Sequence, residues 1–282
     1  MSKIYGLVGH PVGHSFSPAM HNAAFQSLGM EAEYRLYDIA PDGLEQFIRT
    51  AKARGIYGFN VTIPHKVAVW RFLKEHGGLD GEAERLGAVN TVSADGDRPR
   101  GFNTDGAGFI RSLEEDLGFD PTAKHIMFIG AGGAARALIM SLGNRPHGIY
   151  VTDIDAKKSE EIRTQYAGSF DARRFRVFPS SDLKRIVTVC ELLVNATPVG
   201  MKADDPSPVD NGYFHRNLIV YDLVYNRPET RLVREAGEKG IRAVTGLGML
   251  LFQGAATFEI WTGMRPPIDI MREALNREIK RC

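Results

Sequence analysis

An apolar segment, residues 126–129, runs directly into the glycine-rich sequence Gly130-Ala-Gly-Gly-Ala-Ala-Arg136. The spacing G-x-G-x-x-A between a strand and a helix constrains the fold, because the first glycine permits a tight turn, the second lets the backbone approach a pyrophosphate, and the small third residue allows close helix–strand packing. The N-terminus of the following helix directs backbone N–H groups at the phosphates. The segment therefore predicts a Rossmann-type, doubly wound sheet with a dinucleotide site at Gly130, Ala131, Gly132, Gly133 and Ala134.

An acidic residue, Asp153, follows the next predicted strand, residues 148–152. At that place, about 20 residues beyond the glycines, this fold puts the carboxylate that binds the ribose hydroxyls of the adenosine. Such a carboxylate repels a 2′-phosphate, and the neighbouring Ile154 supplies no guanidinium, although Lys157 and Lys158 lie close in sequence. We therefore predict NAD as the preferred cofactor, with NADP possible; the alternative for Asp153 is a simple turn after the strand.

The rest of the chain alternates between strand-length apolar runs and segments of helical period, which predicts parallel α/β architecture. Before the glycine-rich segment we expect strands at residues 4–9, 33–37 and 57–63, and helices at residues 18–28, 44–54 and 106–117. After it, strands are expected at 176–179, 192–195 and 218–223, and helices at 249–262 and 268–281. We predict that the final helices return to the first domain. The substrate domain then contains residues 1–105 and 247–282, and the dinucleotide domain contains residues 106–246. We expect the ligands to bind in a cleft between the two domains.

Composition excludes several classes of protein. The 282 residues are 43% hydrophobic and carry a formal charge of +1, so the chain lacks the basic field that binding to nucleic acid or an anionic membrane needs. It has no apolar run of the ~20 residues that cross a membrane and no signal-peptide pattern at its start. Its two cysteines, Cys190 and Cys282, lie far apart, which argues against a disulfide framework. We expect a cytoplasmic protein with a small-molecule partner.

The histidines do not suggest a metal site. None of the eight has the spacing of a zinc-binding helix, and His10 and His14 are separated by Pro11 and Gly13. We therefore predict no metal.

Two segments end on ionisable residues that neither a strand nor a turn requires: Asn60-Val-Thr-Ile-Pro-His-Lys66 and Gly101-Phe-Asn-Thr-Asp105-Gly106. A parallel-sheet protein presents its chemistry at strand ends and in the loops that follow them. Most lysines are solvated and most Asp-Gly pairs are turns. The surrounding motifs nevertheless favour the hypothesis that Lys66 and Asp105 form an acid/base pair.

Near the N-terminus, Ser15 and Ser17 stand directly before Pro18, a residue suited to the first turn of a helix. Ser17 could be an ordinary N-cap. The two hydroxyls beside a helix N-terminus could equally form a carboxylate pocket, and the spacing alone favours neither.

These segments, taken together, resemble the shikimate dehydrogenases, including the quinate/shikimate dehydrogenase branch. The resemblance covers nearly the whole chain and rests on the following motifs: His14-Ser15-Phe-Ser17-Pro18, Asn60-Val-Thr62-Ile-Pro-His-Lys66, Gly87-Ala-Val-Asn90-Thr91, Asn103-Thr-Asp105-Gly, the glycine-rich segment at Gly130, Asn195-Ala-Thr197-Pro-Val-Gly-Met201, Asp222-Leu-Val-Tyr225 and Gly248-Met249-Leu-Leu-Phe-Gln253.

The resemblance implies roles for individual residues. Ser15 and Ser17 would hold the substrate carboxylate, with Tyr225 near them, and Lys66 with Asp105 would act beside the reacting C3 oxygen. The expected contacts with ring hydroxyls are Thr62, Asn90, Asp105 and Gln253. The nicotinamide would rest against the segments 195–201 and 246–249, so the further cofactor residues are Thr197, Val224, Gly246 and Met249.

The chain departs from the family's common pattern in two places. Where the NADP-linked members carry Asn-Arg-Thr, this chain reads Thr152-Asp-Ile-Asp155, which supports NAD as the cofactor. In Tyr225-Asn-Arg-Pro228 the proline comes one position later than in the family's common pattern, which makes the substrate contact of Tyr225 less secure. We predict an NAD-linked oxidoreductase, monomeric or homodimeric, that interconverts shikimate or quinate with the 3-dehydro compounds. The rival predictions are a biosynthetic NADP-dependent shikimate dehydrogenase and a non-catalytic nucleotide-sensing homologue.

Overall fold

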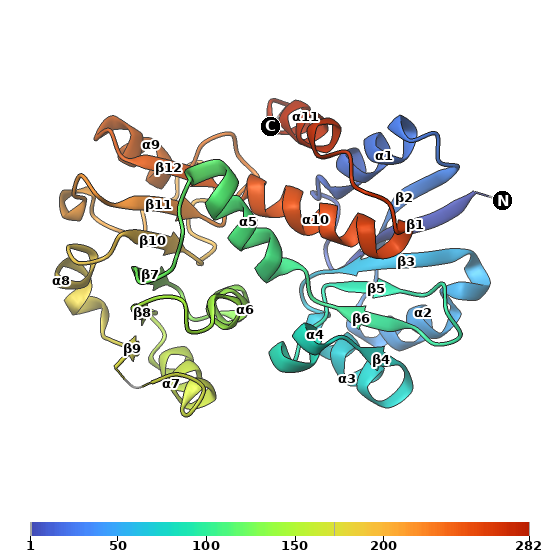
Figure 1. The fold of residues 1–282 in the computed structure, drawn as a ribbon, viewed down its shortest axis with the longest axis horizontal. Coiled ribbons are helices and arrows are strands. Elements are labelled where there is room, and N and C mark those ends of the chain that lie inside the picture. Colours follow the sequence, from blue (N-terminus) through green and yellow to red (C-terminus); the bar gives the residue numbers. More distant parts are fainter. Residues whose placement is uncertain (1, 172, 282) are drawn as a thin grey trace. The chain divides into compact units, whose positions relative to one another are not determined.

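A computed structural model describes residues 2–171 and 173–281, and Cys282 lies outside them. The chain divides into two compact units (Figure 1). The first unit contains the described residues up to Gly108 together with Leu250–Arg281, and the second contains Phe109–Met249.

The first unit is built on a six-stranded sheet in the order β2-β1-β3-β5-β6-β4. Its strands are β1 (Lys3–Gly9), β2 (Ala32–Asp38), β3 (Ile56–Val61), β4 (Gly78–Leu79), β5 (Thr91–Ser93) and β6 (Arg100–Phe102). Its helices are α1 (Ser17–Ser27), α2 (Leu44–Thr50), α3 (Lys66–His76), α4 (Gly81–Leu86), α11 (Ile268–Ile279), the start of α5 (Asp105–Leu117) and most of α10 (Leu247–Thr262).

Helices cover both faces of this first sheet. Leu44 and Phe47 of α2 and Val69 of α3 pack with Val8 on one face. On the other face Tyr5 stacks on Phe25 of α1 and on Trp261 of α10, and α11 packs against α1. The final helices therefore return to the first unit, as expected, because their apolar faces complete its core.

The first sheet is mixed rather than parallel, which corrects the expectation from the sequence. β5 runs antiparallel to both β3 and β6. Strands β5 and β6 have only three residues each, too few for the alternation that reveals a strand, and a short connection of residues 94–99 joins them. Antiparallel neighbours need no helical crossover, so the alternating pattern of strand and helix breaks off here.

The second unit contains a fully parallel sheet in the order β12-β11-β10-β7-β8-β9, the doubly wound order. Its strands are β7 (His125–Ile129), β8 (Gly148–Thr152), β9 (Phe175–Val177), β10 (Leu192–Asn195), β11 (Ile219–Asp222) and β12 (Arg242–Thr245). Its helices are α6 (Gly133–Leu142), α7 (Ala156–Tyr166), α8 (Leu183–Val187) and α9 (Arg231–Glu238), with the greater part of α5. Helices α5, α6 and α7 cover one face of the sheet, and α8 and α9 cover the other.

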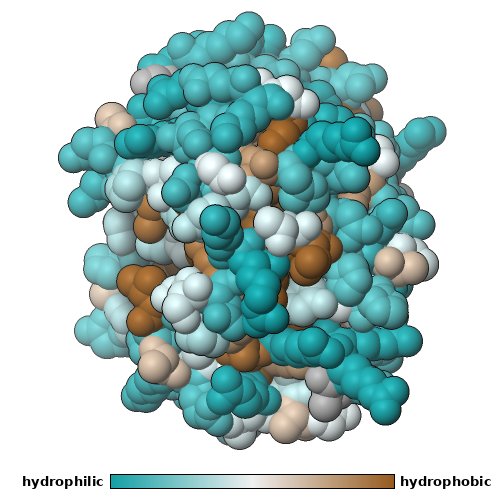
Figure 2. All heavy atoms as spheres, turned by 90° about the vertical axis from the view of Figure 1, so that its left-hand side faces the viewer, coloured by the Kyte–Doolittle hydropathy of each residue, from teal (hydrophilic) through white to brown (hydrophobic). Residues whose placement is uncertain are grey.

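One face of the second unit is mostly polar. Figure 2 shows it covered mostly by hydrophilic side chains, between which hydrophobic residues appear in small areas. Within the described ranges, no helix has both the length and the apolar character to cross a membrane.

Candidate active site

Lys66 and Asp105 form an ion pair in the first unit. Lys66 is the first residue of α3 and Asp105 the first residue of α5, and the Lys66 Nζ lies 2.5 Å from the Asp105 Oδ2. Their side chains are 32% and 13% exposed, so the pair is reachable yet partly shielded from water. The N-terminal turn of α5 also favours a carboxylate, because its backbone N–H groups point toward that end.

Asn90 fixes the other oxygen of Asp105. The Asn90 Nδ2 donates to the Asp105 Oδ1 at 2.8 Å, and the Asn90 Oδ1 accepts from the backbone N–H of Thr104 at 2.9 Å. Asn90 is 2% exposed. We predicted that Asn90 contacts a ring hydroxyl of the substrate. The structure places its side chain in direct hydrogen-bond contact with the Asp105 carboxylate.

The loops after β1 and β3 lie side by side at one edge of the first sheet. The backbone N–H of His10 donates to the carbonyl of Ile63 at 3.1 Å, and the backbone N–H of Thr62 donates to the carbonyl of Val8 at 2.9 Å. Because β1 and β3 are parallel, the loop that carries the two serines and the loop that carries Thr62 extend from the same edge.

The two serines have different positions at the start of α1. Ser17 opens the helix, with Pro18 in its first turn, so Ser17 is not the N-cap; Phe16 occupies that position and makes no side-chain cap hydrogen bond. The Ser15 Oγ accepts from the backbone N–H of Ser17 at 3.2 Å. Ser17 is 5% exposed and Ser15 is half-buried.

Gln253 lies on α10, where this helix passes very close to α5. A Cβ atom on Gly108 would lie 2.6 Å from the Gln253 backbone nitrogen, so only a glycine fits at this crossing. The Gln253 Nε2 donates to the Leu250 carbonyl of its own helix at 2.9 Å. Tyr225, by contrast, belongs to the second unit, where it follows β11.

In the second unit, the glycine-rich segment connects β7 to α6. Gly130 has a φ of +102°, and a Cβ there would lie 2.9 Å from the carbonyl of Ala196, so a side chain would be both strained and crowded. Gly132 is the N-cap of α6, and a Cβ on Gly132 or Gly133 would meet nothing within 4 Å. This open space in front of a helix N-terminus suits the approach of a pyrophosphate.

Asp153 holds the glycine-rich segment in place. Its Oδ2 accepts from the backbone N–H of Ala131 at 2.8 Å, and its Oδ1 accepts from the backbone N–H of Asp155 at 2.8 Å. Both carboxylate oxygens thus have a structural task within the protein. An aspartate at this position consequently does not by itself indicate a ribose contact or a preference for NAD.

Buried polar groups order the loop after β10. The Asn195 Oδ1 accepts from the backbone N–H and the hydroxyl of Thr197, and the Asn195 Nδ2 donates to the Asp222 Oδ1 at 2.8 Å. The Thr230 hydroxyl donates to the other oxygen of Asp222 at 2.7 Å. Burial raises the pKa of the Asp222 carboxyl above its usual range. The sequence motif contained Asp222, but we predicted no role for it.

The predicted cofactor residues gather at the carboxyl edge of this second sheet. The Val224 backbone N–H donates to Asp222 Oδ1 at 3.1 Å and the Gly246 backbone N–H donates to the Val224 carbonyl at 3.2 Å. Gly130 and Thr197 belong to the same edge, because the site of a Gly130 Cβ is 3.0 Å from the Thr197 Cγ2. Met249 is partly buried and packs against the core on the face of the sheet that α5, α6 and α7 cover. Ligands of open parallel sheets bind at this edge.

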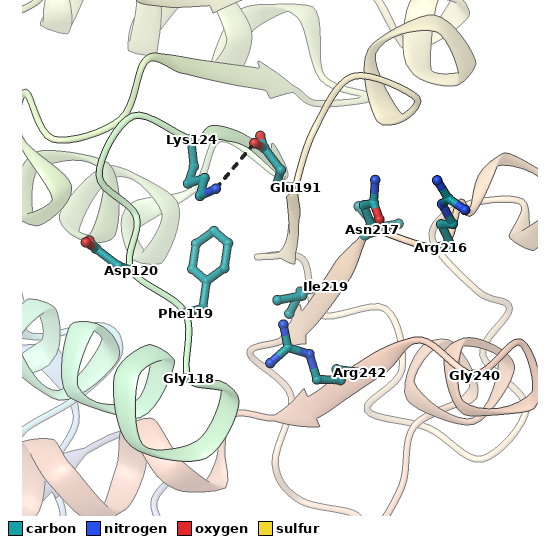
Figure 3. A pocket seen from close by; sticks show the side chains of 11 residues that line it. Gly118, Phe119, Asp120, Lys124, Glu191, Arg216, Asn217, Ile219, Gly240 and Arg242 are labelled. Atoms are coloured by element: carbon teal, nitrogen blue, oxygen red, sulfur yellow. Dashed lines mark ion pairs between the residues drawn. The ribbon is translucent and has the colours of Figure 1, made fainter.

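A separate cavity of about 670 Å³ opens at the opposite, amino edge of the second sheet. In Figure 3 the Phe119 ring lies between Lys124 and Arg242, and Lys124 pairs with Glu191 at 3.8 Å. Glu191 also accepts a hydrogen bond from the backbone N–H of His125, so both Lys124 and Glu191 have interaction partners within the protein. None of the predicted site residues lines this cavity.

In the part of the chain that the structure describes, no three His, Cys, Asp or Glu side chains come together in a group that could hold a metal ion. His10 instead pairs with Asp38, at 2.5 Å between Nδ1 and Oδ1.

Comparisons with known proteins agree with this architecture. A family model described as the shikimate dehydrogenase substrate binding domain matches residues 7–92, and one described as the shikimate 5′-dehydrogenase C-terminal domain matches residues 246–275. A shikimate dehydrogenase (NADP(+)) of Methanopyrus kandleri is 43% identical over 99% of this chain and 97% of its own.

Two solved structures extend the agreement to three dimensions. A crystal structure of a shikimate dehydrogenase in complex with NADP+ superimposes with a TM-score of 0.89 at 38% identity, covering 99% of this chain and 96% of the other. A quinate dehydrogenase from Corynebacterium glutamicum in complex with NAD has a TM-score of 0.88 at 28% identity, covering 98% and 99%. With motifs, fold and full-length similarity in agreement, this chain belongs to the shikimate dehydrogenase family.

Proposed function

We propose that this protein interconverts shikimate and 3-dehydroshikimate by hydride transfer at C3, with Lys66 and Asp105 as the acid/base pair. The observation that carries the proposal is the ion pair itself: a lysine and an aspartate at the starts of two helices, 2.5 Å apart and partly exposed, with the carboxylate held from behind by Asn90.

The residues divide the chemical work. The nicotinamide dinucleotide, when bound, supplies the hydride acceptor for the alcohol and the hydride donor for the ketone. Lys66 takes the proton of the C3 hydroxyl in oxidation and returns it in reduction, and Asp105 keeps the lysine oriented. Ser15 and Ser17 hold the substrate carboxylate, and Thr62 and Gln253 contact ring hydroxyls. The first unit thus binds the substrate and the second binds the dinucleotide.

For the coenzyme we propose NADP. The relative from Methanopyrus kandleri carries NADP(+) in its name, and the structure that superimposes with a TM-score of 0.89 contains NADP+. Asp153, on which the expectation of NAD rests, is already engaged with two backbone N–H groups. Lys157 and Lys158, exposed in the first turn of α7, can supply the positive charge that a 2′-phosphate needs.

An NAD-linked quinate/shikimate dehydrogenase is the second candidate. The negative charges of Asp153 and Asp155 beside the glycine-rich segment favour it, and so does the likeness to a quinate dehydrogenase in complex with NAD. Quinate differs from shikimate at C1 by a hydroxyl and by ring saturation, a difference that depends on the detailed shape of the pocket.

Initial rates of the purified enzyme with shikimate or quinate, each against NAD+ or NADP+, test both candidates. We expect shikimate with NADP+ to give a kcat/KM at least about tenfold above the other three pairs, the effect of one charge-assisted phosphate contact. The double variant Lys157→Ala, Lys158→Ala should lower kcat/KM for NADP+ and leave that for NAD+ unchanged. Faster turnover with NAD+ would replace the first candidate by the second, and no turnover with any pair would indicate a nucleotide-sensing homologue.

A further inference from the structure

The register of the first sheet places three polar side chains on one face. Tyr34 of β2 pairs with Tyr5, and Asn60 of β3 pairs with Leu7, two residues further along β1. Thr91 of β5 pairs with Asn60. Because side chains alternate between the faces of a sheet, Tyr34, Asn60 and Thr91 project to the same side, where α10 covers them. Their exposed fractions are 2%, 5% and 0%.

Helix α1 fixes Tyr34 in two ways. The ring of His21 stacks on the ring of Tyr34 with centroids 4.5 Å apart and planes inclined by 2°. The Asn22 side chain bridges the backbone of Tyr34: its Oδ1 accepts from the Tyr34 N–H at 2.7 Å, and its Nδ2 donates to the Tyr34 carbonyl at 3.1 Å. The position of the tyrosine hydroxyl is therefore determined by its surroundings.

The Tyr34 hydroxyl and the Asn90 carbonyl hold the Asn60 amide from its two sides. The tyrosine hydroxyl donates to the Asn60 Oδ1 at 2.8 Å, so the Asn60 Nδ2 must face the other way. There the Nδ2 lies within hydrogen-bond distance of the Asn90 carbonyl, at 3.2 Å, and of the hydroxyls of Thr91 and Thr257, at 3.0 and 3.2 Å. A flipped amide would direct its oxygen at the carbonyl oxygen of Asn90, which is repulsive.

From Asn60 the hydrogen bonds continue to the ion pair. The Thr91 hydroxyl, next to Asn60, donates to the Asn90 Oδ1 at 3.0 Å. The Asn90 Nδ2 donates to the Asp105 Oδ1, and the Asp105 Oδ2 accepts from Lys66. All members before Asp105 are buried, where a missing hydrogen bond is costly and a complete network is stiff.

We propose that Tyr34 is a positioning residue for the Lys66–Asp105 pair, acting through Asn60 and Asn90. Its hydroxyl donates to Asn60, and the path from there to Asp105 runs through Thr91 and Asn90. This inference rests on the proposed function, because it assigns Tyr34 a part in the same proton transfer. Loss of its hydroxyl leaves the buried Asn60 Oδ1 without this donor, so the Asn60 side chain is held less firmly, which loosens Asn90 and weakens its hydrogen bond to Asp105.

Tyr34→Phe tests the proposal, because it removes the hydroxyl and keeps the ring stacked on His21. Tyr5→Phe is the matched control: Tyr5 is 1% exposed and stacks on Phe25 and Trp261 in the same aromatic cluster. We expect Tyr34→Phe to lower kcat for shikimate oxidation about fivefold, as for the loss of one net hydrogen bond, with KM changed less than about twofold. Tyr5→Phe should leave kcat unchanged.

The pH profile separates positioning from a loss of stability. With less hydrogen bonding from Asn90, more of the Asp105 charge stabilises the Lys66 ammonium, so the midpoint of the kcat profile for oxidation should move to higher pH in Tyr34→Phe. In an Asn60→Ala background, adding Tyr34→Phe should have no further effect, because the path to Asp105 is already cut. Equal kcat and pH midpoint in Tyr34→Phe and Tyr5→Phe, or additive effects with Asn60→Ala, would overturn the proposal.

A measurement without substrate keeps this inference distinct from the proposed function. Solvent exchange of the Asn60 and Asn90 side-chain amide protons, followed by NMR, should be faster in Tyr34→Phe than in the wild type and in Tyr5→Phe. An inactive wild type with this difference would refute the proposed function and retain the Tyr34 path. An active wild type without it would refute the path alone.

Discussion

At the scale of single residues, the candidate chemistry depends on how Asp105 is held. One of its oxygens faces Lys66 and the other faces Asn90, so the carboxylate cannot turn without breaking a hydrogen bond. Lys66 and Asp105 could be predicted from the sequence, because each is an ionisable residue at the end of a strand-like or turn-like motif. Tyr34 could not, because a tyrosine in a strand is an ordinary core residue, and its partner Asn60 is distant in sequence.

The buried His21 makes stability depend on pH. It is fully buried, neither ring nitrogen has a hydrogen-bond partner among the described residues, and burial lowers its pKa to about 3. The unfolded chain, with an ordinary histidine pKa near 6.5, therefore binds a proton that the folded protein does not bind. Stability from this residue is present above pH 6.5 and is lost as the pH falls toward 3.

We predict that the wild type loses about 2 kcal/mol more unfolding free energy than His21→Phe between pH 7.5 and pH 5, from this difference in proton binding. Phenylalanine keeps the stacking on Tyr34 without a titrating group. Tryptophan fluorescence in urea is the suitable measurement, because Trp70 and Trp261, the two tryptophans of the chain, both lie in the first unit. The same pH dependence in both proteins would show that His21 is not held neutral.

At the scale of elements, parallel strands place functional loops at one edge of each sheet. The loops after β1 and β3 adjoin in the first unit, and the segments after β7 and β10 adjoin in the second. The strand–helix alternation predicts this arrangement, because each crossover must return the chain to the start of the next parallel strand. The hairpin of β5 and β6 escaped prediction because its strands are too short for a periodic signal, although Asn90 immediately precedes it.

Two glycines of the dinucleotide segment should respond differently to alanine. Gly130→Ala should lower the thermal midpoint of the ligand-free protein, through about 1–3 kcal/mol of backbone strain, because its φ is +102° and its Cβ would crowd Ala196. Gly132→Ala should leave that midpoint unchanged, because its φ is −74° and the space around a Cβ is open.

Binding of the dinucleotide, measured by calorimetry, should nevertheless weaken in Gly132→Ala, since the added methyl group would occupy the space that we assign to the pyrophosphate. Unchanged binding in this variant would mean that the phosphates lie elsewhere.

At the scale of the whole molecule, the chain folds into two compact units with separate cores. The overall plan could be predicted from the sequence, since each unit has its own periodic pattern and motif. The coenzyme could not be predicted as securely: the sequence shows that Asp153 is acidic but not that its oxygens bind the backbone of Ala131 and Asp155. A carboxylate with structural hydrogen bonds and one that faces a ribose are identical in sequence.

We propose that Lys66 moves the proton in shikimate oxidation, and kcat of Lys66→Ala with saturating shikimate and NADP+ tests this role most directly. Lys74→Ala is the control, because Lys74 lies on the same helix α3 but is exposed and packs its ammonium over the ring of Trp70. We predict that Lys66→Ala lowers kcat by roughly 10² to 10⁴, the range for a positioned general acid/base, with a smaller change in KM and with Lys74→Ala at wild-type rates. A kcat for Lys66→Ala equal to that of the wild type would contradict the account.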